Sequence, residues 1–257
     1  MFFYYGYGSI FYEKYGNSEK KMIILGGWGD TRKSFMNIIN YFKDDYTIYI
    51  FDYPGFGKSA FPDKDLSIYD YTNIIRDFMD ENDIVNPVII SHSFGGRIAI
   101  LLAGYYKEPI EKIIMIDTAG IKNRKKFFVL FKEKLYKFLK NLNIFLPKKK
   151  RNKYINKLLN KFGSSDYKAL PGNMMKSFRN IIDENLVDYL KFIDSEVLIL
   201  WGEKDTDTPL KNGILKSKLI PDSALIVLKN ATHYSYLEHP ILMNNIIDCF
   251  LNNKNLD

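Results

Sequence analysis

The stretch Ser91-His92-Ser93-Phe94-Gly95 is the most informative part of the chain, because it places a serine on a turn that only small residues can make. The apolar run before it, residues 86–90, predicts a short buried strand. Residues 96–103 after it predict a helix. A strand, a sharp turn and a helix in this order form a nucleophile elbow, which lifts the serine hydroxyl above the edge of a sheet. The usual pattern is G-x-S-x-G, and here Ser91 stands in the position of the first glycine.

A serine nucleophile needs a base, and the chain offers His92, His233 and His239. His92 is adjacent to Ser93, and its side chain leaves the turn in another direction. His239 precedes a proline in or beside the last helix, where a surface or packing role is expected. His233 follows the apolar run 224–228 on a loop, and open α/β sheets build their sites at the carboxyl ends of strands. We therefore predict that His233 is the base.

A carboxylate is needed to orient that histidine, and three candidates follow the apolar strand at residues 197–202. Asp205 lies just past the end of this strand and is the favoured acid. Asp207 is its competitor, and Glu203 is a weaker one.

The order Ser93, Asp205, His233 along the chain is that of α/β-hydrolase triads. The chain resembles the α/β-hydrolase superfamily over nearly its whole length, in four motifs that occur in the expected order. Two departures are Gly26, where relatives often have histidine, and Ser91 in place of glycine. The four motifs are Leu25-Gly26-Gly27-Trp28-Gly29-Asp30, similar to the oxyanion loop; the Pro-Gly-x-Gly segment in residues 52–59; residues 201–205, similar to the acid loop; and residues 230–233, similar to the histidine loop.

An oxyanion hole is expected beside the nucleophile, because attack on a carbonyl places negative charge on its oxygen. Two backbone N–H groups must point at that oxygen, and each can lower the barrier by about 3–4 kcal/mol. One is predicted from Phe94 at the start of a helix, and the other from Trp28, where flanking glycines allow close approach of the backbone. An ordinary tight turn is the alternative interpretation of the glycines around Trp28.

The segment Gly55-Phe56-Gly57-Lys58-Ser59 resembles the end of a phosphate-binding P-loop, but the pattern fails. The first glycine of a P-loop would fall at Asp52, whose carboxylate would repel phosphate. No helical pattern begins at Ser59. We interpret the segment as a turn that supports the site.

The composition predicts a compact cytoplasmic enzyme without cofactor or metal. The 257 residues, 46% of them hydrophobic, are enough for one core and an insertion. The single cysteine, Cys249, allows no internal disulfide and is expected to be buried in the last helix. We find no signal peptide, no apolar run of transmembrane length, no metal-ligand cluster and no internal repeat in the sequence.

Alternating strands and helices predict the α/β class, here the α/β-hydrolase fold: a mostly parallel central sheet with helices on both faces. Strands are expected at 10–15, 21–25, 47–51 and 112–117, and helices near 33–42 and 68–81. Residues 1–118 and 191–257 are predicted to form the core. Residues 119–190 are predicted to form an inserted helical cap.

The predicted cap is basic. Residues 121–161 hold thirteen lysines and two arginines against one glutamate, a net +14, whereas the whole chain carries +7. Apolar residues recur there at helical spacing, namely Phe127, Phe128, Phe131, Leu135, Phe138, Leu139 and Leu142. The favoured interpretation is a helix packed on the core with a solvated lysine face. Weak contact with an anionic membrane surface or attraction of acidic substrates is the alternative, and nucleic acid is not an expected partner.

Together these features predict a serine hydrolase that cleaves a small or medium carboxylic ester. Ser93 would attack, His233 would transfer the proton, and Asp205 would orient the imidazole. Hydrolysis of a carbon–carbon bond in a ketone-type substrate is the second hypothesis, which the resemblance to capped relatives implies. A binding protein without catalysis is the third. The natural substrate and the oligomeric state are left open.

Overall fold

The computed structural model describes residues 1–6, 8–30, 32–122 and 174–254. Its centre is an eight-stranded sheet in the order β1-β2-β4-β3-β5-β6-β7-β8. The pairs β1–β2 and β2–β4 are antiparallel, and every pair from β4 to β8 is parallel. The strands are β1 (Phe2–Tyr5), β2 (Gly8–Tyr15), β3 (Lys21–Leu25), β4 (Thr47–Asp52), β5 (Val88–His92), β6 (Lys112–Ile116), β7 (Glu196–Gly202) and β8 (Ser223–Leu228).

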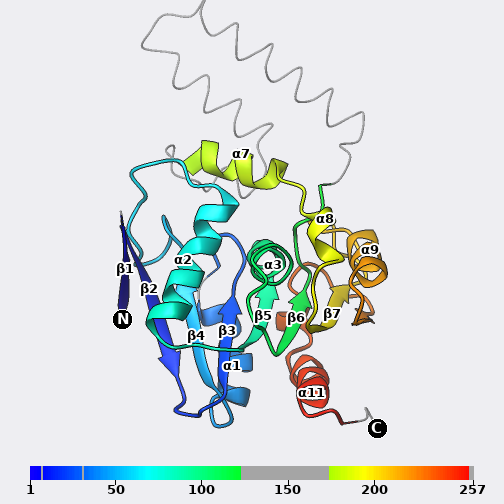
Figure 1. Ribbon diagram of the computed structural model, residues 1–257. Coiled ribbons are helices and arrows are strands. Elements are labelled where there is room, and N and C mark those ends of the chain that lie inside the picture. The colour runs from blue at the N-terminus through cyan, green and yellow to red at the C-terminus, as the bar shows by residue number, and fades with distance from the viewer. Residues whose placement is uncertain (7, 31, 123–173, 255–257) are drawn as a thin grey trace, which may run out of the picture.

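Helices cover both faces of this sheet (Figure 1), which confirms the predicted fold class. The helices are η1 (Arg32–Phe35), α1 (Met36–Phe42), α2 (Ile68–Glu81), α3 (Gly95–Ile100), η2 (Leu101–Tyr105), α7 (Met175–Asp183), α8 (Val187–Leu190), α9 (Lys211–Leu219), α10 (Ser235–Glu238) and α11 (Pro240–Leu251). The helices α2, α3 and α8 pack on one face, and α1 and α11 pack on the other.

The central strands are apolar along their whole length because both of their faces are buried. Alternate residues of β3 enter opposite halves of the core: Ile23 faces α2 and α3, whereas Met22 and Ile24 face α1 and α11. At its start, α2 has a capping box, in which the Ser67 hydroxyl accepts from Asp70 N–H and the Asp70 carboxylate accepts from Ser67 N–H. Apolar packing against helices on both faces therefore holds the central strands in place.

Three local features differ from the sequence-based expectations. The short strand β1 was not predicted; it pairs with β2, and Phe3 packs edge-on against Phe78 at 5.4 Å between ring centroids. The helix predicted at residues 96–103 is a short α-helix followed by the π-helical turn η2. The Cys249 side chain is half-buried rather than fully enclosed.

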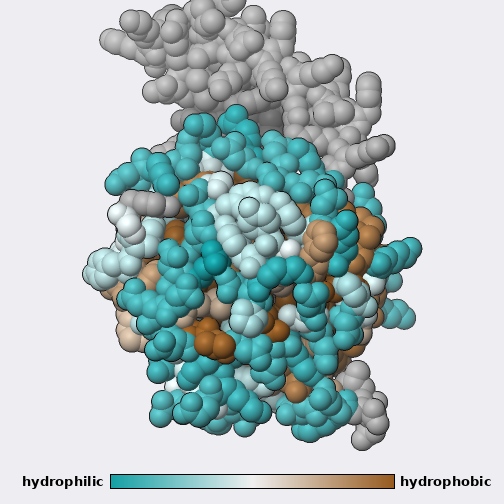
Figure 2. Space-filling model, viewed as in Figure 1, coloured by the Kyte–Doolittle hydropathy of each residue, from teal (hydrophilic) through white to brown (hydrophobic). Residues whose placement is uncertain are grey.

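Most of the predicted cap, residues 123–173, lies outside the described residues. This part includes the apolar residues from Phe127 to Leu142 and the lysines between them. The described part of the cap range includes α7, which crosses above the carboxyl ends of the strands (Figure 1). The described surface in Figure 2 is mostly hydrophilic, with small separate hydrophobic areas. Among the described helices, none combines the length and apolar character needed to cross a membrane.

Candidate active site

The elbow between β5 and α3 forces Ser93 into a left-handed backbone conformation, with φ of 46°. Such a conformation is strained for a non-glycine residue and is typical of functional sites. The glycines that follow are required by space. A Cβ at Gly95 would lie 2.0 Å from the Leu25 carbonyl oxygen, and one at Gly96 would lie 2.3 Å from the Thr118 side chain. The elbow therefore packs directly against the neighbouring strand ends.

Ser91 fits in the first glycine position of the motif because its hydroxyl finds a partner. The side chain is fully buried, and Oγ donates to the Ile114 carbonyl of the neighbouring strand β6 at 3.1 Å. A buried hydroxyl with a hydrogen bond carries little penalty, so serine replaces glycine there without disturbing the sheet.

Ser93, His233 and Asp205 form one chain of hydrogen bonds. The Ser93 Oγ lies 3.0 Å from His233 Nε2, and His233 Nδ1 lies 2.9 Å from Asp205 Oδ2. The residues come from the ends of β5, β7 and β8, whose carboxyl ends meet at one edge of the sheet. This is the spacing that general-base activation of a serine requires.

Asp205 is held by four donors, and it is the one of the three candidate acids with a hydrogen bond to His233. Its Oδ1 accepts from the N–H groups of Asp207 and Thr208, and its Oδ2 accepts from the Thr208 hydroxyl and from His233. Asp207 and Glu203 are exposed, and the Glu203 carboxylate accepts from Asn230 N–H. The structure thus brings Asp205, and neither rival, into contact with His233.

The pKa values of this pair move apart. Burial acts to raise the pKa of Asp205, but hydrogen bonds from His233 and Thr208 outweigh it and the net pKa is lowered. Burial acts to lower the pKa of His233, but the hydrogen bond and charge of Asp205 outweigh it and the net pKa is raised. The aspartate is therefore ionised at neutral pH and stabilises a proton on the histidine.

The backbone N–H groups of Trp28 and Phe94 have no acceptor among the described residues. Both residues line the pocket beside Ser93, and their rings lie 4.9 Å apart. The Gly95 N–H donates to the Gly26 carbonyl at 3.0 Å, which joins the elbow to the loop that carries Trp28. Two free donors next to a serine are the elements of an oxyanion hole.

The pocket above Ser93 has a volume of about 270 Å³. Trp28 and Phe178 form apolar parts of its wall, and His233 lies at its base. Arg97 also lines it and donates to the carbonyls of Ile182 and Glu184, which ties the end of α7 to α3. Burial lowers the pKa of Arg97 to about 10, so this guanidinium stays protonated at neutral pH.

Neither of the other two histidines has a hydrogen bond to the Ser93 hydroxyl among the described residues. His92 Nδ1 contacts Asp30, and His239 precedes α11 as its N-cap residue.

Asp117 is a buried carboxyl group that the sequence analysis missed. Its carboxylate accepts from Gly202 N–H and from the Ser235 hydroxyl, so it joins the acid loop to the histidine loop. Burial raises its pKa to about 6, although these two donors act in the opposite direction. Its position just after β6 could have indicated a role in the site, because ligand and active sites of α/β proteins form at the carboxyl ends of parallel strands.

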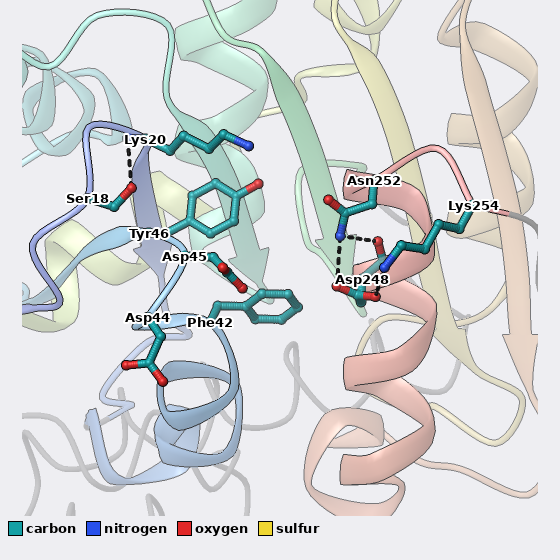
Figure 3. A pocket seen from close by; sticks show the side chains of 9 residues that line it. All are labelled: Ser18, Lys20, Phe42, Asp44, Asp45, Tyr46, Asp248, Asn252 and Lys254. Carbon is teal, nitrogen blue, oxygen red and sulfur yellow. Dashed lines mark hydrogen bonds and ion pairs between the residues drawn. The ribbon is translucent and has the colours of Figure 1, made fainter.

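A larger cavity of about 460 Å³ lies at the opposite end of the sheet, between the end of α1 and α11 (Figure 3). Lys254 in its wall pairs with Asp248, and none of its nine lining residues is a histidine. It contains none of the predicted site residues. Within the described part of the chain, no group of three or more His, Cys, Asp or Glu side chains could hold a metal ion.

A serine, a histidine and an aspartate in this contact, above the carboxyl ends of parallel strands, are the arrangement of an α/β-fold hydrolase. The chain belongs to the α/β hydrolase fold family, whose model matches residues 20–240.

Relatives with esterase names align over nearly the whole chain. A pimeloyl-[acyl-carrier protein] methyl ester esterase of Wigglesworthia glossinidia brevipalpis is 28% identical and covers 96% of this chain and 99% of its own. A putative esterase/lipase of Mycoplasma pneumoniae is 25% identical, with coverages of 95% and 94%. The crystal structure of MGS-M2, an α/β hydrolase enzyme from a Medee basin deep-sea metagenome library, superposes with a TM-score of 0.77 at 18% identity. It covers 100% of this chain and 99% of its own.

Proposed function

We propose that the protein hydrolyses a small or medium carboxylic ester through an acyl-enzyme on Ser93. His233 Nε2 takes the proton from Ser93 Oγ as this oxygen attacks the ester carbonyl, and the Trp28 and Phe94 N–H groups stabilise the oxyanion. The tetrahedral intermediate expels the alcohol, which His233 protonates. Water, deprotonated by His233, then attacks the acyl-enzyme, the bond from the acyl carbon to Ser93 Oγ breaks, and His233 returns the proton to Oγ as the acid leaves. Asp205 holds the imidazole in the required tautomer throughout.

The observation that carries this proposal is the unbroken contact from Ser93 through His233 to Asp205 at the base of a pocket. The free N–H groups of Trp28 and Phe94 support it. The esterase names of two relatives support the ester class.

Two further proposals accompany this function. Residues 119–190 form a cap on a core of residues 1–118 and 191–257, which is supported by Phe178 of α7 lining the pocket. A cytoplasmic location is supported by the single cysteine.

The test combines a fluorophosphonate label with p-nitrophenyl esters of graded chain length. We expect stoichiometric labelling at Ser93 and highest kcat/KM on short or medium acyl chains. Ser93→Ala should keep the fold and lose activity by about 10⁴–10⁶-fold, as when a triad serine is removed. Labelling at another residue would refute the assignment. Labelling at Ser93 without ester turnover would favour the carbon–carbon hydrolase, and absence of labelling would favour a binding protein.

A further inference from the structure

Asp30 and His92 form a second buried Asp–His pair directly behind the proposed triad. The Asp30 Oδ2 lies 2.9 Å from His92 Nδ1. The His92 side chain is 1% exposed and that of Asp30 is 14% exposed. Neither residue lines the pocket around Ser93, so neither is placed to touch a substrate.

Asp30 closes the turn that presents Trp28. Its N–H donates to the Gly27 carbonyl at 3.2 Å, and its Oδ2 accepts from the Gly27 N–H at 2.8 Å. The peptide groups on both sides of Gly27 are therefore held by one residue, and the second of them carries the Trp28 N–H. A Cβ at Gly27 would lie 2.6 Å from Asp30 Oδ2 and 3.1 Å from His92 Nδ1. Glycine at position 27 is thus needed for this contact.

His92 connects that turn to the base. It is the residue before Ser93, and its Nε2 donates to the backbone carbonyl of His233 at 2.9 Å. The rings of His92 and His233 lie 4.9 Å apart. One imidazole therefore contacts the oxyanion turn on one side and the histidine loop on the other. The titratable side chains around it are Asp30, Asp117, His233, Tyr234 and Tyr236.

The hydrogen bonds fix the orientation of the His92 ring. The His233 carbonyl can only accept, so His92 Nε2 is the donor to it, and His92 Nδ1 faces the Asp30 carboxylate. The His92 contact and the Gly27 N–H lower the pKa of Asp30 against the opposing effect of burial. Because one oxygen atom of Asp30 accepts from both Gly27 and His92, an amide cannot replace the carboxylate. An amide oxygen there would carry no charge toward His92 Nδ1, and an amide nitrogen there would face the Gly27 N–H.

We propose that the hydrogen-bonded Asp30–His92 pair positions the oxyanion donor of Trp28 and the base His233 relative to Ser93. This inference rests on the proposed serine hydrolase mechanism. Asp30 and His92 are positioning residues, which act through the groups that they hold.

The test is a double-mutant cycle with Asp30→Asn and His92→Gln, measured on a short p-nitrophenyl ester. Misplacement of catalytic groups by about 1 Å can cost about 10²-fold. We expect kcat to fall about 10–100-fold in each single variant, with KM changed less than about threefold. The double variant should lose about as much as either single one, because the two residues act as a unit.

Affinity for an alkyl trifluoromethyl ketone gives a readout that a general loss of stability would not move. This ketone adds to Ser93 and then needs the oxyanion donors, whereas the matched methyl ketone binds largely without addition. In the Asp30 and His92 variants, we expect the affinity for the trifluoromethyl ketone to fall in parallel with kcat. The affinity for the methyl ketone should stay constant. Glu108→Gln removes the half-buried ion pair with Arg76 and serves as the matched control, with kcat unchanged.

Additive losses, or a parallel fall in both ketone affinities, would overturn the proposal. Asp30→Ser, which keeps an acceptor for Gly27 but removes the charge, serves if Asp30→Asn fails to fold, and the same kcat loss is expected. If the wild-type protein neither turns over esters nor takes the fluorophosphonate label, the proposed function fails. If it does both and the Asp30 variants keep full kcat, only the present inference fails.

Discussion

Asp205→Asn should leave the fold intact and remove nearly all turnover. The reason lies in the donors around this carboxylate. Its Oδ1 accepts two backbone N–H groups, from Asp207 and Thr208, so the amide oxygen of an asparagine must occupy that position. The amide nitrogen must then take the place of Oδ2, where it faces His233 Nδ1.

That orientation selects the wrong tautomer of the histidine. An amide N–H facing Nδ1 makes Nδ1 the acceptor, so the ring proton moves to Nε2, which then cannot take the proton of Ser93. The Thr208 hydroxyl can still donate to the Asp117 carbonyl, so no buried group is left without a partner. Loss of the correct tautomer in a serine triad costs about 10⁴-fold in kcat, or about 5.4 kcal/mol at 1.36 kcal/mol per decade.

Steady-state hydrolysis of p-nitrophenyl acetate, with thermal unfolding as a check on the fold, measures this loss. Asp207→Asn is the matched control, because this exposed residue lines the same pocket but its carboxylate has no hydrogen bond to His233, and only its backbone N–H supports Asp205. We expect it to retain most of the activity. Equal losses in both variants, or more than about a tenth of wild-type kcat in Asp205→Asn, would refute the assignment of the acid.

Three further predictions concern pH, packing and charge. The kcat/KM should fall as the pH drops through the pKa of His233, which lies above 6.5 because Asp205 stabilises its proton, and an acid limb centred below pH 6.5 would contradict this. By linkage, the protonated His233 stabilises the fold below pH 6.5, and this contribution should disappear as the pH rises through the raised pKa. Gly95→Ala should lower the free energy of unfolding by about 3 kcal/mol or more in urea titrations, because the new Cβ would lie 2.0 Å from the Leu25 carbonyl oxygen. Gly6→Ala is the control, because no atom lies within 4 Å of its new Cβ, and it should change the free energy of unfolding by less than about 0.5 kcal/mol. Similar losses in Gly95→Ala and Gly6→Ala would be inconsistent with the packing described. If the lysines and arginines of residues 121–161 contact anionic surfaces, the protein should co-sediment with acidic lipid vesicles at low salt and dissociate at high salt. Changing Lys132, Lys137 and Lys140 to glutamate should abolish sedimentation and spare short-ester hydrolysis, and absence of sedimentation at low salt would leave the lysines as a solvated face.

The fold was predictable from sequence because its signals are local. A buried parallel strand is a short apolar run, and the elbow demands small residues at fixed spacing around Ser93. The strand β1 escaped because four aromatic residues at a chain end carry no periodic pattern. It is identified only by its pairing with β2 and by the contact of Phe3 with Phe78, which is distant in sequence.

The candidate triad was predictable because each member directly follows a predicted strand. The residues that hold it in place were not. Asp30 and His92 are 62 positions apart, and their contact depends on the register between β3 and β5. The sequence around Lys216 is typical of a solvated helical lysine, yet this residue is fully buried, and its Nζ donates to the carbonyls of Thr118 and Ala119. Such contacts follow from tertiary packing, which a single sequence does not encode in any local pattern.

The chain departs from the strand β6 and returns to the core at nearly the same point. Leu186 N–H donates to the Gly120 carbonyl at 2.9 Å, and Lys122 N–H donates to Asn185 Oδ1 at 3.0 Å. An insertion whose two ends are joined by hydrogen bonds can vary in length at little cost to the core, because loop length adds only slowly to the entropic cost of closure. The segment between these ends can therefore be lengthened, shortened or exchanged in evolution while the hydrogen-bonded arrangement of Ser93, Asp205 and His233 is retained. One reaction centre could in this way be adapted to many substrates, and a laboratory graft between residues 122 and 185 could exploit the same freedom.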